Sequence, residues 1–355
     1  MLLHFYQPPT QEQEITRSIL ESCYLPLLRL LSQKSEFGLT LNVSGSLLFQ
    51  LKQMGANEFF SLLNDLIADG KIEIVTSVMY HPIMPLTPKD VLKRQIEKNN
   101  QILKDLLGME MTNGFFPPEL AMDNKTLKLM NSRYIYLDGS SLEGKGPIVK
   151  YNNKYLLVNN HQICNLFRSY PEQLQTKTVT NLLKSEFVLT ANDVELFGHH
   201  YKERLQVLGD LLDCPVVKFI TVSEAVSKFG RGVPEVHEIS DSTWQECAGF
   251  ALWNKNLLQK EYLKLLELAH GLSDDDFLDR SYSSCYLYWL SNWPWWHPGL
   301  VEKGVENLVK SVKGNKTVEA VAQQFLDQMW NYHGSGHVEE NYQKFNSLEN
   351  KYLGI

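Results

Sequence analysis

Short apolar segments alternate with segments of helical periodicity over the first two thirds of the chain, and this alternation restricts the fold most. The strand-like segments are short, apolar and bounded by turn residues: 2–6, 38–45, 71–78, 114–119, 134–139, 186–193 and the first part of 216–229. The helical stretches between them include residues 12–33, 46–69, 89–107 and 123–132. Strands that alternate with helices predict a parallel sheet with crossover helices, and about seven such units fit a closed barrel of the α/β class.

The last third of the chain has a different pattern. Helical periodicity continues over residues 254–270, 299–313 and 316–334, without strand-like segments. We therefore predict a barrel over residues 1–235 and a helical subdomain over residues 236–355 that packs against it and completes its cleft. One segment departs from this plan, because residues 145–165 read as a β-hairpin, which we expect to be an insertion.

The composition argues against several classes of protein. The 355 residues carry a net charge of −7, whereas a nucleic-acid-binding domain usually shows a basic excess. No stretch approaches the roughly 18 consecutive apolar residues of a membrane span, so we expect none. The first residues, MLLHFYQPPTQEQE, have no basic region and no cleavage site of small residues, which argues against a signal peptide.

Five cysteines lie far apart in the sequence, and no C-x-x-C pair occurs. Scattered cysteines in odd number are typical of reduced thiols that serve as small core residues, so we expect a cytoplasmic protein. Because no histidines and cysteines share the spacing of metal ligands, we predict no metal and no other cofactor. The sequence leaves the oligomeric state open.

An active site in a parallel α/β barrel forms where strands end and loops begin. The predicted strand ends carry many ionisable, polar and aromatic side chains: His4, Gln7, Asn42, Ser44, Glu73, Tyr80, His81, Glu119, Asp138, Asp193, Glu195, His199 and His200. A single histidine in a loop is more often a surface or core residue than a catalyst. The convergence of these residues on one rim is therefore what indicates a site.

Two carboxyl groups stand out in this set. Glu119 follows two prolines that restrict the backbone, and Asp193 follows an apolar strand, where burial would favour its protonated form. Each also has a structural explanation, Glu119 as an acid in the first turn of a helix and Asp193 as a helix N-cap. Two positioned carboxyl groups are what glycoside hydrolysis needs, one as nucleophile and one as acid and base.

Tryptophans are concentrated in residues 288–298, YWLSNWPWWHP, which hold four of the seven in the chain. Indole rings can pack against the flat CH faces of sugars. Trp295 and Trp296 lie between prolines in a predicted loop, so they are candidates for a cleft wall, or for anchors of a subdomain interface. Trp289 and Trp293 are more simply explained as core residues of the helical subdomain.

Taken together, these segments resemble glycoside hydrolase family 57, over nearly the whole chain and in the order of that family's short sequence regions. The first region, H-x-x-Q-P, is similar to HFYQPP at 4–9, and the second to KIEIVTSVMYHPIMPL at 71–86. GFFPPELAMD at 114–123 resembles the third region, and LTANDVELFGHH at 189–200 the fourth. LTLNVSG at 39–45 and the helical motif at 283–304 are also similar to stretches of the family.

The resemblance implies an incomplete (β/α)7 barrel with a C-terminal helical bundle, and retaining chemistry on α-glycosidic bonds without a metal. It makes Glu119 the nucleophile and Asp193 the general acid and base. The same resemblance assigns substrate binding to further residues: His4, Gln7, Glu73, His81, His199 and, in the loop at 241–249, Trp244. We expect Glu119 to be held ionised by hydrogen-bonding partners, with His81 or His4 as candidates.

Several functions stay open on the sequence. An α-1,4-glucan substrate suits either an amylase-type hydrolase or a 4-α-glucanotransferase, and an α-galactosidase-type enzyme would fit as well. Departures from the family pattern, such as Tyr6 in place of a second histidine and Val194 in place of glycine, bear on that choice. A metal-dependent polysaccharide deacetylase on a similar barrel also stays open, as does a catalytically inactive glucan-binding homologue.

Overall fold

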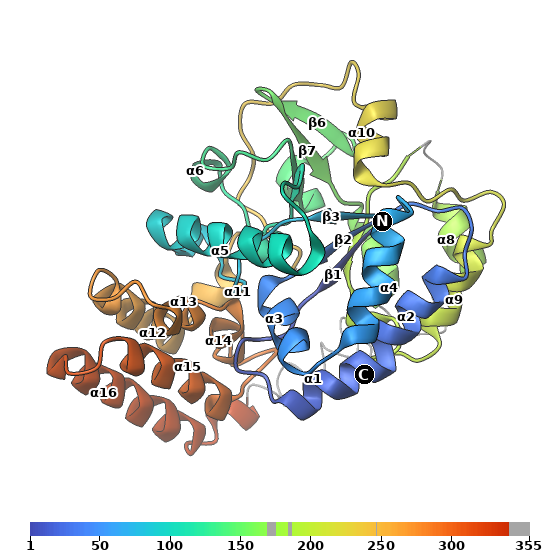
Figure 1. The fold of residues 1–355 in the computed structure, drawn as a ribbon. Helices are drawn as coiled ribbons and strands as arrows, with labels where there is room; N and C mark the ends of the chain where they lie inside the picture. The colour runs from blue at the N-terminus through green and yellow to red at the C-terminus, as the bar shows by residue number, and fades with distance from the viewer. Residues whose placement is uncertain (169–174, 184–186, 246, 341–355) are drawn as a thin grey trace.

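The computed structural model describes residues 1–168, 175–183, 187–245 and 247–340. Parallel strands lie at its centre, helices surround them, and a further group of helices lies at one side (Figure 1). The strands are β1 (Leu2–Phe5), β2 (Leu39–Val43), β3 (Ile72–Val75), β4 (Gly114–Phe115), β5 (Tyr134–Leu137), β6 (Ile148–Tyr151), β7 (Lys154–Val158) and β8 (Ala191–Asp193).

Two four-stranded sheets meet at one β-bridge. The first has the order β3-β2-β1-β8 with all neighbours parallel, and the second has the order β4-β5-β7-β6 with only β6 antiparallel. A parallel bridge between Thr76 and Phe115 joins β3 to β4. Beyond β7, the amide of Asn160 donates to the carbonyl of Leu189, ahead of β8, at 2.7 Å. In the described part of the chain, the parallel strands therefore follow one another as β8-β1-β2-β3-β4-β5-β7.

The strands present different residues to their two sides because successive side chains alternate. Leu3 and Phe5 of β1, like Leu41 and Val43 of β2, pack in one apolar cluster with α2 (Leu25–Ser32), α3 (Gly45–Gln53) and α4 (Asn57–Ala68). Leu2, between these positions, belongs to a second cluster with the side chains of other strands. We call the side that carries this second cluster the inner side. His4 and Asn42 share it, because each lies one residue from a helix-facing side chain.

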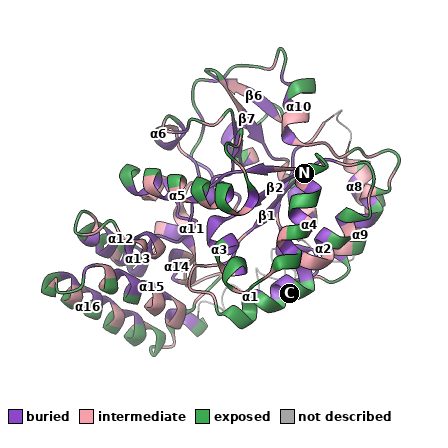
Figure 2. Ribbon diagram, in the orientation of Figure 1, coloured by how far each residue is buried: buried purple, intermediate pink, exposed green. Residues whose placement is uncertain are grey.

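Further helices cover the outside of the strands, and their exposed faces point outward while their buried faces meet the core (Figure 2). They are α1 (Gln13–Ile19), α5 (Lys89–Leu107), α6 (Asn124–Leu127), α7 (His161–Arg168), α8 (Thr176–Leu182), α9 (Arg204–Leu212) and α10 (Val222–Phe229). A π-helical turn, Leu20–Tyr24, joins α1 to α2.

The last helices form their own apolar core, which includes Trp253, Tyr262, Tyr286 and Phe325. They are α11 (Ala251–Asn254), α12 (Leu257–Ala269), α13 (Asp276–Ser281), α14 (Ser284–Trp289), α15 (Pro298–Ser311) and α16 (Lys316–His333), drawn in orange and red in Figure 1. Ile83 and Ala121 of the strand-containing part join the same cluster. None of the helices in the described residues combines the length and apolar composition that crossing a membrane requires.

The structure corrects two of the predicted elements. The single helix predicted over 46–69 is two helices, because the chain turns at Gly55, whose φ of 70° is accessible to glycine without strain. The strand predicted at the start of 216–229 is absent from the described residues. There the carbonyl of Phe219 accepts from Gly38 at 3.0 Å, and the Thr221 hydroxyl caps α10.

Two further predictions are modified. The hairpin predicted within 145–165 is present as β6 and β7, yet β7 also pairs in parallel with β5, so it belongs to the sheet rather than to an insertion. The strand predicted over 186–193 is found only at Ala191–Asp193, and Glu186 lies outside the described residues. Residues 341–355 of the predicted helical subdomain also lie outside them.

An ion pair between a partly exposed arginine and a buried aspartate connects α5 to the group of C-terminal helices. Arg94 Nη2 lies 2.6 Å from Asp279 Oδ1, and the side chain of Asp279 is 0% exposed. We predict that Arg94→Met lowers the free energy of unfolding by about 3 kcal/mol, because it leaves a buried carboxylate unpaired. Arg29→Met is the matched control, since the Arg29–Glu58 pair is exposed and its loss should cost under about 1 kcal/mol. Equal losses in urea-induced unfolding would contradict this difference.

Candidate active site

The inner side of the sheet brings residues of β1, β2 and β8 into one row. His4 is the register partner of both Asn42 and Asp193. Asn42 Nδ2 donates to the carbonyl of Val75 at 3.0 Å, so its Oδ1 is free to accept from His4 Nδ1 at 2.7 Å. This bond leaves His4 Nε2 unprotonated. Burial lowers the pKa of His4 to about 4, so the ring is neutral at physiological pH.

A stack of aromatic rings surrounds His4. The centroid of its ring lies 4.5 Å from that of Phe116 and 4.9 Å from that of His81, and His81 stacks on Tyr6 at 4.1 Å. Burial also lowers the pKa of His81 well below its usual range. The Nε2 atoms of His4 and His81 are buried and have no hydrogen-bond partner among the described residues. The site therefore holds two neutral imidazoles, each with one free nitrogen.

Glu119 sits in a backbone conformation that few residues with side chains adopt. The chain leaves β4, passes Pro117 and Pro118, and turns with φ of 58° at Glu119 and 48° at Leu120. Such angles are uncommon outside glycine and occur where the surrounding structure determines them. The backbone amide of Trp244 donates to the Glu119 carbonyl at 3.0 Å and helps to hold this turn.

Two donors fix the Glu119 carboxylate. Trp244 Nε1 donates to Oε2 at 2.7 Å, and Ser284 Oγ donates to Oε1 at 3.2 Å. Because the Ser284 hydroxyl gives its proton to Glu119, it accepts from His81 Nδ1 at 3.0 Å. Burial nevertheless raises the pKa of Glu119 to about 7, because it outweighs these hydrogen bonds, and the charge of Asp193 acts in the same direction.

Asp193 and Glu195 are two acidic residues at the end of β8 whose charges interact. Burial raises the pKa of both, and the charge of Asp193 raises that of Glu195 further. Tyr24 OH and Gln7 Nε2 donate to Glu195 Oε1 at 2.5 and 3.0 Å. Arg168 acts in the opposite direction, since its positive charge lowers the pKa of Asp193.

The predicted site residues fall into two groups. His4, His81, Glu119, Asp193 and Trp244 lie together, linked by the hydrogen bonds, ring contacts and charge interactions described above. The expectation that a histidine holds Glu119 is corrected, because the donors are Trp244 and Ser284, and His81 Nδ1 is 3.8 Å from Oε1. Gln7 is buried, and its Nε2 donates to Glu195 Oε1 and to Tyr24 OH.

The other predicted residues lie elsewhere. Glu73 precedes Val75, the register partner of Asn42, by two positions, and its carboxylate accepts from Ser223 N and Oγ at 2.8 and 2.7 Å. His199 is exposed and lies 3.5 Å from Ser22 Oγ.

The two loop tryptophans also differ in their surroundings. Trp296 Nε1 donates to His333 Nδ1 at 3.1 Å, so this indole packs on α16. Trp295 is 53% exposed, and its ring lies 6.5 Å from that of Tyr288. Burial raises the pKa of Tyr288, and the charges of Glu119 and Asp193 act in the same direction. Trp295 is thus near Tyr288, and Trp296 packs on α16.

The sequence-based reasoning did not identify three residues of the site: Arg168, Ser284 and Tyr288. Ser284 and Tyr288 belong to the helical motif SSCYLYW, whose serine and tyrosine lie four residues apart and so share a face of α14. That spacing was a usable signal. Arg168 had none, because it ends α7 far from any recognised motif and reaches the site by placing its guanidinium 4.8 Å above the Trp244 ring.

Comparison with known proteins decides the family. The sequence model of glycosyl hydrolase family 57 matches residues 3–233. The chain belongs to this family. An α-amylase of Pyrococcus furiosus is 29% identical to it over 140 residues, which are 38% of this chain and 21% of the amylase. This chain thus matches only about a fifth of that relative.

Solved structures of family 57 proteins share the fold. The 4-α-glucanotransferase of Thermococcus litoralis superposes with a TM-score of 0.66 at 18% identity, over 88% of this chain and 59% of that one. The branching enzyme of Pyrococcus horikoshii also gives 0.66, at 14% identity, over 97% and 94% of the two chains. In this family 57 chain, no group of three or more His, Cys, Asp or Glu residues in the described ranges could hold a metal ion.

The raised pKa of Glu119 predicts a pH-dependent stability. The carboxyl titrates near 7 in the folded chain and near 4.5 as a free side chain, so folding favours the protonated form. The folded state therefore loses stability as the pH rises from about 4.5 to 7, by about 2–3 kcal/mol. Glu119→Gln cannot ionise, so its free energy of unfolding relative to that of the wild type should increase by about 2–3 kcal/mol between pH 5 and pH 8.

Urea-induced unfolding at the two pH values measures this difference. Trp244→Phe serves as the matched variant, because it removes the donor to Oε2 and should enlarge the pH-dependent loss only when Glu119 is present. A difference between Glu119→Gln and the wild type that stays the same at both pH values would contradict the raised pKa.

Proposed function

We propose that this chain is a retaining enzyme that acts on α-1,4-glucans, as an amylase-type hydrolase or a 4-α-glucanotransferase. The observation that carries the proposal is the pair of Glu119 and Asp193. Glu119 follows β4 and Asp193 ends β8, and the two carboxyl groups are close enough for the charge of Asp193 to raise the pKa of Glu119. Membership of family 57 and the similarity to proteins named α-amylase and 4-α-glucanotransferase support the same activity.

The proposed mechanism divides the reaction between these two groups. Glu119 Oε1 or Oε2 attacks the anomeric carbon and forms a glycosyl ester, while Asp193 gives its proton to the departing glycosidic oxygen. Asp193 then takes a proton from water or from a sugar hydroxyl, whose oxygen displaces Glu119 and restores its carboxylate. The same pair thus catalyses hydrolysis or transfer, depending on which acceptor enters.

The surroundings of the two groups determine which of them is ionised. A nucleophile must be ionised while the acid is protonated. Burial raises the pKa of Glu119 to about 7 and that of Asp193 to about 6, so in the free chain Asp193 ionises at the lower pH. The proposed roles therefore require a bound sugar to reverse this order, by desolvating Asp193 further while the Trp244 and Ser284 bonds favour the charged form of Glu119. The Nε2 atoms of His4 and His81, which have no partner among the described residues, can accept hydrogen bonds from sugar hydroxyls.

We further propose how the fold carries this site. The parallel strands would constitute the incomplete (β/α)7 barrel, within residues 1–235, and residues 236–355 would form the subdomain that completes the cleft. The register of β8 with β1 and the bridge from β3 to β4 support the first statement. The contact of Ser284 with Glu119 supports the second. The five free cysteines support a reducing, cytoplasmic location.

Incubation with maltoheptaose tests the activity. Products that are only shorter than the substrate mean hydrolysis, whereas a ladder of longer and shorter chains means transfer. Glu119→Gln should lower kcat by roughly 10³-fold or more, about 4 kcal/mol of barrier, because no glycosyl ester can form. Glu195→Gln is the matched control and should keep most of the activity. An unchanged rate in Glu119→Gln would exclude it as the nucleophile.

A substrate with a good leaving group tests the role of Asp193. The aryl group of an activated aryl α-glycoside departs with little protonation. The rate of aryl release by Asp193→Asn, relative to the wild type, should therefore fall at least tenfold less than its rate of maltoheptaose cleavage. Both rates are measured against wild type at the same pH. If both substrates are impaired equally, Asp193 is not the general acid, and the same dependence in Glu195→Gln would move the role to Glu195.

A further inference from the structure

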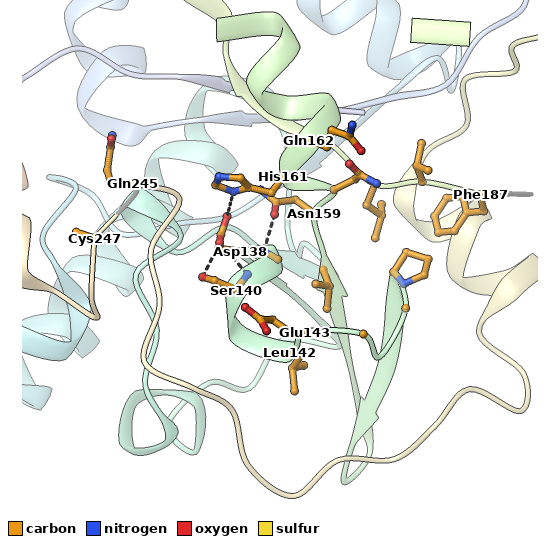
Figure 3. Close-up of a pocket in the computed structure, with 18 residues that line it drawn as sticks. Asp138, Ser140, Leu142, Glu143, Asn159, His161, Gln162, Phe187, Gln245 and Cys247 are labelled. Carbon is orange, nitrogen blue, oxygen red and sulfur yellow. Dashed lines mark hydrogen bonds and ion pairs between the residues drawn. The ribbon is translucent and has the colours of Figure 1, made fainter. Parts of the chain in front are cut away.

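The proposed general acid, Asp193, lies at the end of a short strand that is supported on one side. β8 has three residues and pairs only with β1 among the described strands. A cavity of about 650 Å³ lies near its other side, at the carboxyl ends of β5 and β7, and the lining of this cavity includes Leu189, which precedes β8 (Figure 3). The turn that Asp193 begins, Val194–Leu196, receives no capping hydrogen bond from its side chain. The sheet alone therefore does not fix the direction of this carboxyl group.

The π-helical turn between α1 and α2 packs directly against the turn that follows β8. Cys23 Sγ donates to the carbonyl oxygens of Val194 and Phe197, at 3.1 and 3.4 Å. Tyr24 OH donates to Glu195 Oε1 at 2.5 Å. Both Cys23 and Tyr24 are fully buried. Two neighbouring residues thus hold the same turn, one through its backbone and one through a side chain, and π-helical turns within helices are frequent at functional sites.

A glycine lets these two turns approach so closely. A Cβ atom at position 198 would lie 2.6 Å from the Ser22 carbonyl oxygen, so only Gly198 fits there. Its φ of 126° is likewise a conformation that glycine adopts without strain. The turn after β8 is therefore fixed at its start by the bonds from Cys23 and at its end by this close contact. The Glu195 side chain is its third point of attachment.

Glu195 is held by a closed triangle of hydrogen bonds. Besides Tyr24 OH, Gln7 Nε2 donates to its Oε1 at 3.0 Å, and the same Gln7 nitrogen donates to Tyr24 OH at 3.1 Å. The three side chains are buried and come from segments that follow β1, α1 and β8. Because each contacts the other two, the triangle restricts the Glu195 side chain to one orientation. The backbone two residues earlier, at Asp193, is restricted with it.

We propose that Tyr24 is a positioning residue, which through Glu195 orients the carboxyl group of Asp193 toward the glycosidic oxygen. The inference rests on the proposed function and adds to it the residue that directs its acid. Tyr24 is fully buried, so it acts through Glu195 and does not contact the sugar. The Asp193 proton can pass to the departing oxygen only within hydrogen-bond reach. A looser turn should therefore slow this proton transfer and leave the attack by Glu119 unaffected.

The variant Tyr24→Phe tests the proposal, because it keeps the ring and removes only the hydroxyl group. Cleavage of maltoheptaose needs the Asp193 proton, and its rate should fall about tenfold. Release of the aryl group from an activated aryl α-maltoside needs little protonation, so its rate should fall by about threefold at most. Both rates are measured at the same pH and relative to the wild type. A loss of stability alone would lower both rates by the same factor.

Matched variants separate positioning from the general effect of losing a buried hydrogen bond. Tyr262→Phe removes an equally buried hydroxyl, which donates to the Ser281 carbonyl at 2.8 Å in the C-terminal helices, and it should leave the ratio of the two rates unchanged. Glu195→Gln should also keep this ratio, because its amide oxygen can accept the same two hydrogen bonds. Glu195→Leu cannot accept them and should change the ratio as Tyr24→Phe does.

Hydrogen exchange measures the same contact without a substrate. In Tyr24→Phe, the backbone amides of residues 194–200 should exchange about fivefold faster than in the wild type, because their turn has lost a hydrogen bond that holds it. Tyr262→Phe should leave these amides unchanged. Equal losses of the two rates, or unchanged exchange in Tyr24→Phe, overturn the positioning role. A wild type that cleaves neither substrate overturns the proposed function instead, and faster exchange confined to Tyr24→Phe would then still support the hold of Tyr24 on this turn.

Discussion

The arrangement of the site depends on how the Glu119 carboxylate is held. The backbone of Glu119 adopts a left-handed conformation, and that turn persists because Trp244 bonds both its carbonyl and its side chain. Ser284 adds a donor from the C-terminal helices, and His81 in turn donates to Ser284. A strained turn and a buried acid both cost stability, so the remaining contacts of the site act to maintain one arrangement.

The alternation of side chains along the strands explains how this arrangement arises. On β1 and β2, one set of residues packs against α2, α3 and α4, and the next set faces the inner side. His4 and Asn42 therefore lie among aromatic rings instead of among helices, and their mutual hydrogen bond removes one polar burial cost. The same pattern that buries the core thus orients the polar row.

Much of this could be predicted from the sequence, because strand ends and restricted loops leave local signals. Glu119 behind two prolines and Asp193 behind an apolar run were found in this way. The sequence gives no such signal for how far a residue lies from the end of its strand. The prediction that placed Glu73 in the site did not account for that distance. Glu73 lies two positions before Val75, and its carboxylate holds the start of α10. Arg168 and Ser284 were missed for a related reason, since their contacts depend on how distant elements pack.

The site draws on residues from both ends of the chain, because Ser284 bonds Glu119 while His4 stacks on His81. During synthesis on a ribosome, the strands through β8 emerge well before α14. At that stage the nascent chain has exposed Glu119, but Trp244, which donates to its Oε2, has not yet emerged, and Ser284, which donates to its Oε1, emerges later still. The hydrogen-bonded arrangement around Glu119 is therefore completed late, when the C-terminal helices dock.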